Sequence, residues 1–306
     1  MQKLMRSRAR IVVPHASDSL KGYVVMENRE KSRPTLSLGI LSWRAHETLR
    51  QTLSTYAPLM PLVDEKIIYF NAITPEDRAL AEEFGFEPRG GAANLGILGG
   101  TRALVHELSG DLVMLCQNDN PINVLPDVLA ARLDVARASI ARGEVKWVRV
   151  LDRFARGFSN AHKFERYWDE GILCKLRRMV RPDKASQLRG RAVNVFENPE
   201  ERFPEIFRRS ADGLLISSSR WVNYSDQPFM AQRDFMIEAL DWADSHADGY
   251  RGLNGMAVPE IVLNSSNWWR NGNFPIGISD GVFTHRRLDD SFRSNNRHFN
   301  PDIVGK

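Results

Sequence analysis

Residues 90–122, GGAANLGILGGTRALVHELSGDLVMLCQNDNPI, decide the fold. A glycine-rich turn opens this stretch, and apolar side chains at helical spacing follow in 104–108. Gly110 ends the predicted helix, because glycine tolerates the left-handed conformation found just past helix ends. The apolar run Leu112–Cys116 then changes to four polar residues that include Asp119. Ligands bind at the carboxyl ends of strands in open α/β sheets, so this change predicts a binding site. Because Asp119 is ionised, we expect it to bind a cation or a phosphate-bound cation.

The composition is that of a globular protein with a sizeable core. The 306 residues are 42% hydrophobic and 26% charged. No apolar run reaches membrane-spanning length, and the basic N-terminus lacks the apolar core of a signal peptide, so we expect cytoplasmic residence. Cys116 and Cys174 are far apart in sequence, which predicts two buried thiols rather than a zinc site or a disulfide.

The positive charge is concentrated in one segment. The net charge is +4, and residues 175–191, KLRRMVRPDKASQLRGR, hold seven basic residues and one acid. Two interpretations stay open, a solvated surface or a contact with phosphate or lipid headgroups. A contact with lipid headgroups would make the protein peripheral to the inner membrane.

Strand-like and helix-like segments alternate through residue 151. This alternation predicts an α/β fold with a mostly parallel sheet and helices on both faces. The expected strands are Thr35–Leu41, Lys66–Phe70, Phe86–Pro88, Leu112–Cys116 and Glu144–Leu151, and the other expected helices are Ala45–Tyr56, Thr74–Gly85 and Pro126–Ala141.

The pattern is looser after residue 151. Residues 164–168, 204–209 and 229–246 have helical spacing, and Gly213–Ser217 has the composition of a short strand.

Two common nucleotide-binding motifs are absent. The junction after the first expected strand is Leu41-Ser42-Trp43-Arg44, which has no glycine cluster, so an NAD-binding Rossmann unit is not expected. The phosphate-binding G-x-x-x-x-G-K-[ST] motif does not occur either.

Four segments, in their order along the chain, carry a family resemblance. They are Ser37–Leu53 (SLGILSWRAHETLRQTL), Ile67–Asn71 (IIYFN), Asn94–Gly96 with the following glycines, and Leu115–Asp119. In this order the sequence resembles the GT-A-fold glycosyltransferases of the family-2 type, which use nucleotide-sugar donors. Residues 1–34 show no steady period and end at Pro34, which predicts an N-terminal arm or covering segment. The resemblance implies a nucleotide-sugar-binding α/β half at 35–151 and a looser acceptor-binding half of the same domain at 152–306.

The resemblance also implies a donor site. The donor-binding residues would be Ser42, Trp43, Arg44, Asn71, Asn94, Gly96, Gln117, Asn118, Asp119 and Arg286. Asp119 and His285 would be ligands of Mn²⁺ or Mg²⁺, and Arg287 would be a further diphosphate contact. Asn71 and Gln117 stand where the family usually has acids. Metal affinity grows with the number of carboxylates, so we expect the ion to be held mainly through the donor diphosphate.

The chemistry implied is transfer of a sugar from a UDP- or GDP-linked donor, with inversion, to a glycan or lipid-linked acceptor. Such a reaction needs a carboxylate base. Glu260 is the first candidate, Asp234 the second and Asp280 the third. Acceptor contacts are expected from Asn223, Asp226, Trp268 and Trp269, since tryptophan faces stack on sugar rings.

Two other functions stay open, a catalytically silent protein of this fold that binds nucleotide or carbohydrate, and a nucleotidyltransferase. The latter would need a basic, glycine-rich loop after the first strand. Nucleic acid is not expected as a partner, because the basic cluster lacks interleaved aromatic residues.

Overall fold

The computed structural model describes residues 33–154, 161–250, 252 and 255–286. The described part from Pro34 onward belongs to one compact unit. Residues 1–32 of the predicted arm, and Arg287, lie outside the described residues.

The described residues form a nine-stranded sheet in the order β3-β2-β1-β4-β8-β5-β9-β7-β6. β1 pairs in parallel with β2 and β4, and β5 pairs in parallel with β9. β8 lies antiparallel between β4 and β5, and β7 lies antiparallel to β9. Among the strands of the described residues, all but β7 and β8 run in the same direction, so the predicted mostly parallel sheet is confirmed. The strands are β1 (Leu36–Ser42), β2 (Glu65–Phe70), β3 (Glu87–Arg89), β4 (Leu112–Gln117), β5 (Trp147–Leu151), β6 (Arg208–Arg209), β7 (Leu215–Ser218), β8 (Phe229–Gln232) and β9 (Pro275–Phe283).

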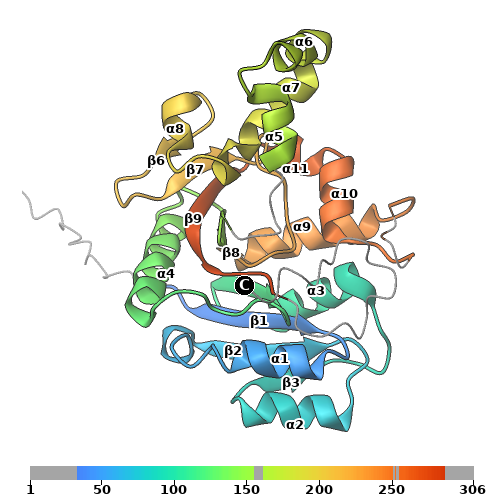
Figure 1. Cartoon of the computed structure of the whole chain (residues 1–306). Coiled ribbons are helices and arrows are strands. Elements are labelled where there is room, and N and C mark those ends of the chain that lie inside the picture. The colour runs from blue at the N-terminus through green and yellow to red at the C-terminus, as the bar shows by residue number, and fades with distance from the viewer. Residues whose placement is uncertain (1–32, 155–160, 251, 253–254, 287–306) are drawn as a thin grey trace, which may run out of the picture. The chain divides into compact units, whose positions relative to one another are not determined.

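Helices cover both faces of this sheet (Figure 1). The helices are α1 (His46–Leu53), α2 (Pro75–Glu83), α3 (Gly96–Glu107), α4 (Pro126–Ala141), α5 (Ala161–Trp168), α6 (Ile172–Val180), α7 (Pro182–Leu188), α8 (Pro199–Arg202), α9 (Arg233–Ser245), α10 (Pro259–Ser265) and α11 (Trp268–Gly272). Two 3-10 segments are η1 (Met60–Leu62) and η2 (Arg189–Asn194).

Side-chain alternation in the strands divides the core into two layers. Val113 and Leu115 of β4 pack with α3 and α9, whereas Met114 and Cys116 pack with α1 and α4. Such alternation follows from the two-residue period of a strand. Because both layers are apolar, β4 is buried on both faces and reads in the sequence as one continuous apolar run.

Local signals in the sequence place several of these elements. Thr74 caps α2 as predicted, since its hydroxyl accepts from the backbone N–H of Asp77 and the Asp77 carboxylate accepts from the backbone N–H of Thr74. Helix α4 has the predicted bounds. Both cysteines are buried and free, and burial raises the pKa of Cys116 to about 12, so its thiol stays protonated.

Two predictions in the second half are wrong. Residues 204–209 are not a helix, because Arg208 and Arg209 form β6 and pair with β7. The segment 229–246 is not one helix either. Its first four residues form β8, and α9 begins at Arg233.

Among the described residues, no helix is both long enough and apolar enough to span a bilayer.

Candidate functional site

The carboxyl ends of β1, β2 and β4 meet at one edge of the sheet. Leu41 lies opposite Gln117 and Ser42 opposite Phe70 in the strand register. The backbone N–H of Asn71 donates to the Ser42 carbonyl at 2.9 Å. Three predicted donor residues, Ser42, Asn71 and Gln117, therefore lie at the same edge, where open α/β sheets bind their ligands.

The turn after β4 is fixed by hydrogen bonds to α1 and to the chain just beyond it. The Thr52 hydroxyl donates to the Asn118 carbonyl at 2.8 Å, and the Tyr56 hydroxyl donates to the Asn120 carbonyl at 2.8 Å. Burial, with the nearby Cys116 and Asp119, raises the pKa of Tyr56 well above its usual value, so the hydroxyl keeps its proton and remains a donor. These bonds hold the turn that carries Asp119.

His285 lies against Asp119. Its Nε2 is 3.2 Å from the Asp119 carboxylate, and the Asp119 side chain is only 4% exposed. The strand extension after β9 sets this contact, because the backbone N–H of Arg286 donates to the Asp119 carbonyl at 2.9 Å and that of Thr284 to the Pro121 carbonyl at 3.0 Å. The structure thus brings together the two residues that the sequence suggested as metal ligands.

The chemistry and spacing of Asp119 and His285 fit a small divalent cation. Carboxylate oxygen and imidazole nitrogen both suit Mn²⁺, and two ligands at about 2.1 Å in neighbouring octahedral positions would lie about 3.0 Å apart. The described residues contain no group of three or more His, Cys, Asp or Glu side chains that could hold a metal ion. Within the described part of the chain, any further ligand of a cation here would therefore be of another kind, such as an amide or backbone oxygen, water or a phosphate.

Asn71 holds the segment before α3. Its Nδ2 donates to the Gly96 carbonyl at 3.0 Å, and its Oδ1 accepts from the backbone N–H of Leu95 at 3.3 Å. Asn94 closes the same turn, since its Oδ1 accepts from the backbone N–H of Gly96 at 2.9 Å. Gly96 has a φ of +71°, which glycine adopts without strain. An acid at position 71 could not donate to Gly96, so the amide is the residue type that this turn requires.

The turn after β1 is exposed at the same edge. Arg44 has a φ of +51°, and its guanidinium lies over the Trp43 ring, 5.6 Å from the ring centre. Both side chains reach solvent.

Two carboxylates approach this edge from the second half of the chain. Glu260 stands in the first turn of α10, and Asp226 lies beside it in the loop before β8. Burial and the negative charge of Glu260 raise the pKa of Asp226 to about 8, and the backbone amide of Glu260 and the Tyr224 hydroxyl lower it only in part. Asp226 lines a small pocket that also includes Gln117. The acceptor candidate thus lies beside the end of β4.

The pKa of Glu260 is also raised, chiefly by desolvation, while the charge of Arg191 lowers it in part. Arg191 belongs to η2, within the basic cluster of 175–191. Sequence reasoning treated that cluster as a surface feature and missed this electrostatic interaction, because nothing local in the chain links position 191 to position 260. The backbone N–H of Leu98 in α3 donates to the Ala257 carbonyl at 3.3 Å, which joins the segment before Glu260 to the first turn of α3.

The other two base candidates are placed differently. Asp234 is fully exposed in the first turn of α9. It follows Gln232, which pairs with Leu112 at the start of β4, so Asp234 lies at the opposite edge of the sheet from Gln117.

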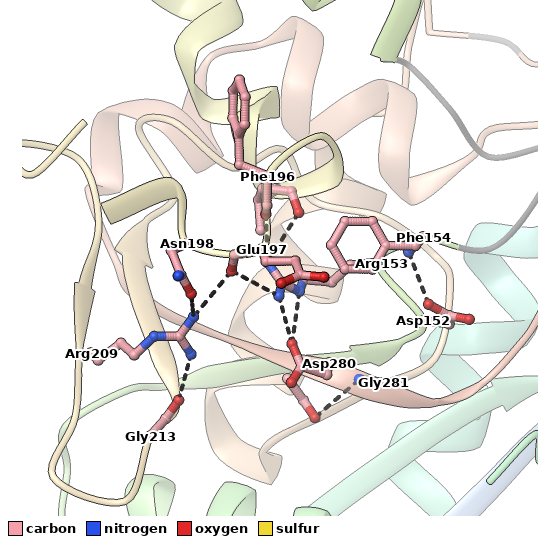
Figure 2. Close-up of polar contacts among 12 residues, drawn as sticks. Asp152, Arg153, Phe154, Phe196, Glu197, Asn198, Arg209, Gly213, Asp280 and Gly281 are labelled. Atoms are coloured by element: carbon pink, nitrogen blue, oxygen red, sulfur yellow. Dashed lines mark hydrogen bonds and ion pairs between the residues drawn. The ribbon is translucent and has the colours of Figure 1, made fainter. Parts of the chain in front are cut away.

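Asp280 forms an ion pair with the buried Arg153 (Figure 2). Nε and Nη2 of Arg153 donate to Asp280 Oδ1 at 3.0 and 2.6 Å, and the Arg153 side chain is only 3% exposed. The same guanidinium donates to the carbonyls of Val193, Phe196 and Glu197. These bonds fasten the irregular part of β9 to η2 and the segment that follows it, beside a cavity of about 520 Å³.

The two adjacent tryptophans have different environments. Trp269 is only 1% exposed, its Nε1 donates to the Val222 carbonyl at 2.7 Å, and its ring packs on Trp147 and Tyr224. This burial contradicts the acceptor role predicted for Trp269. Trp268 is half-buried and stacks on Trp242. The remaining acceptor candidate, Asn223, is exposed.

Comparison with known proteins identifies the fold. No family model and no curated protein matches the sequence. Among solved structures, a mannosyltransferase from Pyrobaculum calidifontis in complex with GDP-Man and Mn²⁺ superposes with a TM-score of 0.50 at 8% identity, over 86% of this chain and 59% of that one. The fold is the GT-A fold.

A second GT-A structure is similar to a lower degree. Glucosyl-3-phosphoglycerate synthase from Mycobacterium tuberculosis, in complex with Mn²⁺, UDP and glucosyl-3-phosphoglycerate, has a TM-score of 0.44 and 14% identity, over 84% of this chain and 73% of that one. At sequence identities of 8% and 14%, the similarity of these structures to this chain concerns the fold alone.

Proposed function

We propose that this protein is a glycosyltransferase that moves a sugar from a UDP- or GDP-linked donor to a hydroxyl group of a glycan or lipid-linked acceptor. The observation that carries the proposal is the Asp119–His285 pair, 3.2 Å apart at the edge where β1, β2 and β4 end. It occurs on a fold shared with a mannosyltransferase solved with GDP-Man and Mn²⁺.

In this proposal, Asp119 and His285 would hold Mn²⁺ or Mg²⁺, with the diphosphate of the donor as a further source of ligands. A divalent cation bound there would neutralise negative charge on the leaving diphosphate. The turn from Ser42 to Arg44 lies at the same edge and would receive the nucleoside. Arg286, whose backbone is fixed to Asp119, would contribute a positive charge to the diphosphate.

Glu260 is the proposed base. The acceptor oxygen attacks the anomeric carbon and its proton passes to the Glu260 carboxylate. The bond from the anomeric carbon to the diphosphate breaks, and its electron pair leaves with the diphosphate, which inverts the configuration. A raised pKa makes a carboxylate a stronger base, and the positive charge of Arg191 opposes part of this rise. Asp226, with a pKa of about 8, keeps its proton near neutral pH. It is then neutral and places no second negative charge beside Glu260.

The test is release of UDP or GDP from a panel of nucleotide sugars with Mn²⁺ and an acceptor mixture, comparing the wild type with Glu260→Gln. We expect the variant to lose about 10²- to 10⁴-fold in kcat, because that is the usual contribution of a positioned base, and to retain its donor affinity. The matched control is Asp234→Asn, which removes a carboxylate at the other edge of the sheet and should retain wild-type turnover. Loss of donor binding in Glu260→Gln would contradict the role as base.

One observation favours a second function, a binding protein without turnover. The described residues provide two candidate ligands and no group of three, and Gln117 stands where the resemblance implies an acid. Donor binding by the wild type, with no product from any donor, would support this alternative.

A further inference from the structure

Helix α6 exposes an apolar face. Its residues Ile172, Met179 and Val180 are 77%, 77% and 76% exposed, and Leu173 and Leu176 are also exposed. At 3.6 residues per turn, these five side chains fall on one arc of about 120° of the helix. Large apolar side chains gathered on one helical face in this way mark an interaction surface.

The opposite face of α6 packs against the rest of the protein. Cys174 is buried and its Sγ lies 3.6 Å from the Glu165 carbonyl. Arg178 donates to the Tyr167 carbonyl at 2.5 Å, and its guanidinium lies over the Trp168 ring. The helix is thus anchored through Cys174 and Arg178, and the anchoring turns the apolar arc outward.

Cations border the apolar arc. Lys175 and Arg177 lie on its two sides by helical spacing, and the exposed Arg181 and Lys184 follow at the start of α7. Residues 161–188 contain seven Lys and Arg against four Asp and Glu, a net charge of +3. Arg177 also donates to the Arg166 carbonyl at 3.0 Å. The last two members of the basic cluster lie outside 161–188, where Arg189 pairs with Glu205 and Arg191 lies near Glu260.

We propose that α6 is a docking surface for an anionic lipid bilayer. An apolar face bordered by cations is the pattern of helices that lie in the membrane interface, with the apolar side chains among the acyl chains and the cations at the headgroups. The group α5 to α7 lies at the end of the fold farthest from α2, with α6 at its tip (Figure 1), which suits contact with a flat surface.

A second copy of the chain fits this face less well. A two-fold interface places the same surface on both subunits, so the cations that border the apolar arc on one subunit would face those of the other. Like charges would then face each other around the apolar contact, whereas anionic headgroups would neutralise them. The inference does not depend on the proposed transferase activity.

The experiment is co-sedimentation of the full chain with phosphatidylcholine vesicles that contain or lack phosphatidylglycerol, at low and high salt. We expect binding to the anionic vesicles only, weakened by salt. Leu173→Ser/Met179→Ser should abolish it. Lys175→Gln/Lys184→Gln should weaken it by an order of magnitude or more, since each cation near an anionic surface contributes about fivefold.

Two control variants match these changes elsewhere on the surface. Leu125→Ser removes another apolar side chain, which is 69% exposed, and Arg78→Gln/Arg208→Gln removes the same charge as the lysine variant. Both should bind like the wild type, and circular dichroism checks that every variant is folded.

Failure of the wild type to bind anionic vesicles would overturn the proposal, as would wild-type binding by Leu173→Ser/Met179→Ser. A wild-type dimer that this variant dissociates in light scattering, without vesicle binding by either protein, would assign the face to a second copy instead.

Discussion

Asp226 combines burial with a neighbouring negative charge. An aspartate in water is ionised at neutral pH, but burial and Glu260 raise the pKa of Asp226 from 3.8 to about 8. The folded state therefore keeps a proton that the unfolded state has lost. As the pH rises from the unfolded value toward 8, this difference destabilises the folded state increasingly, and above 8 the penalty stays constant.

We predict that Asp226→Asn removes this pH-dependent penalty. Even half of the shift from 3.8 to about 8 corresponds to about 3 kcal/mol, so the variant should gain stability over the wild type as the pH rises. The measurement is urea unfolding of both proteins from about pH 5 to about pH 9. If the free energies of unfolding of the two proteins run parallel over that range, the assigned pKa of Asp226 is wrong.

Single residues show what the sequence can indicate and what it cannot. The family resemblance implied Asp119 and His285 from distant parts of the chain, and the structure puts them 3.2 Å apart. Trp268 and Trp269 are indistinguishable by sequence neighbours, yet Trp269 is buried and Trp268 only half-buried. The difference arises from contacts of Trp269 with Trp147 and Tyr224, which are remote in sequence.

At the scale of elements, the start of α3 depends on a side-chain clamp. Asn71, at the end of β2, uses both its amide nitrogen and its amide oxygen on the Leu95–Gly96 segment. This clamp sets the position of the glycine-rich turn relative to β1 and β2. The family resemblance drew attention to position 71 as a missing acid, while the geometry gives the amide a specific role.

We predict that Asn71→Asp destabilises the protein by about 1–3 kcal/mol. The aspartate cannot donate to the Gly96 carbonyl, and a buried carboxylate would face that oxygen without a bond. Asn94→Asp is the matched control, because its carboxylate can still accept from the backbone N–H of Gly96 and should leave stability nearly unchanged. Urea unfolding of the three proteins measures this. Equal stability of Asn71→Asp and the wild type would contradict the clamp.

Strand β8 shows why element prediction failed in the second half. Phe229, Met230 and Ala231 are all buried, because β8 lies in the middle of the sheet with helices on both sides. A short apolar run of this kind has no two-residue alternation, and the helical spacing of α9 follows without a break. The sequence pattern therefore extends the helix four residues too far.

At the scale of the whole molecule, the fold class follows from the alternation of strands and helices up to residue 151. The order of the remaining strands does not, because it is set by long-range pairing. β8 enters between β4 and β5, and β9 returns beside β5 and carries His285 to the end of β4. The N-terminal half thus predicts the sheet edge that carries Asp119, whereas the strand order that brings His285 to this edge is visible only in the structure.

The most direct test of the central claim is calorimetric titration of the wild type and Asp119→Asn with UDP- and GDP-linked sugars, with and without Mn²⁺. We predict that the wild type binds a nucleotide sugar more tightly with Mn²⁺, by tenfold or more, and that Asp119→Asn loses this dependence while staying folded. Absence of binding to every donor, or an equal effect of Mn²⁺ on both proteins, would contradict a nucleotide-sugar site built on Asp119.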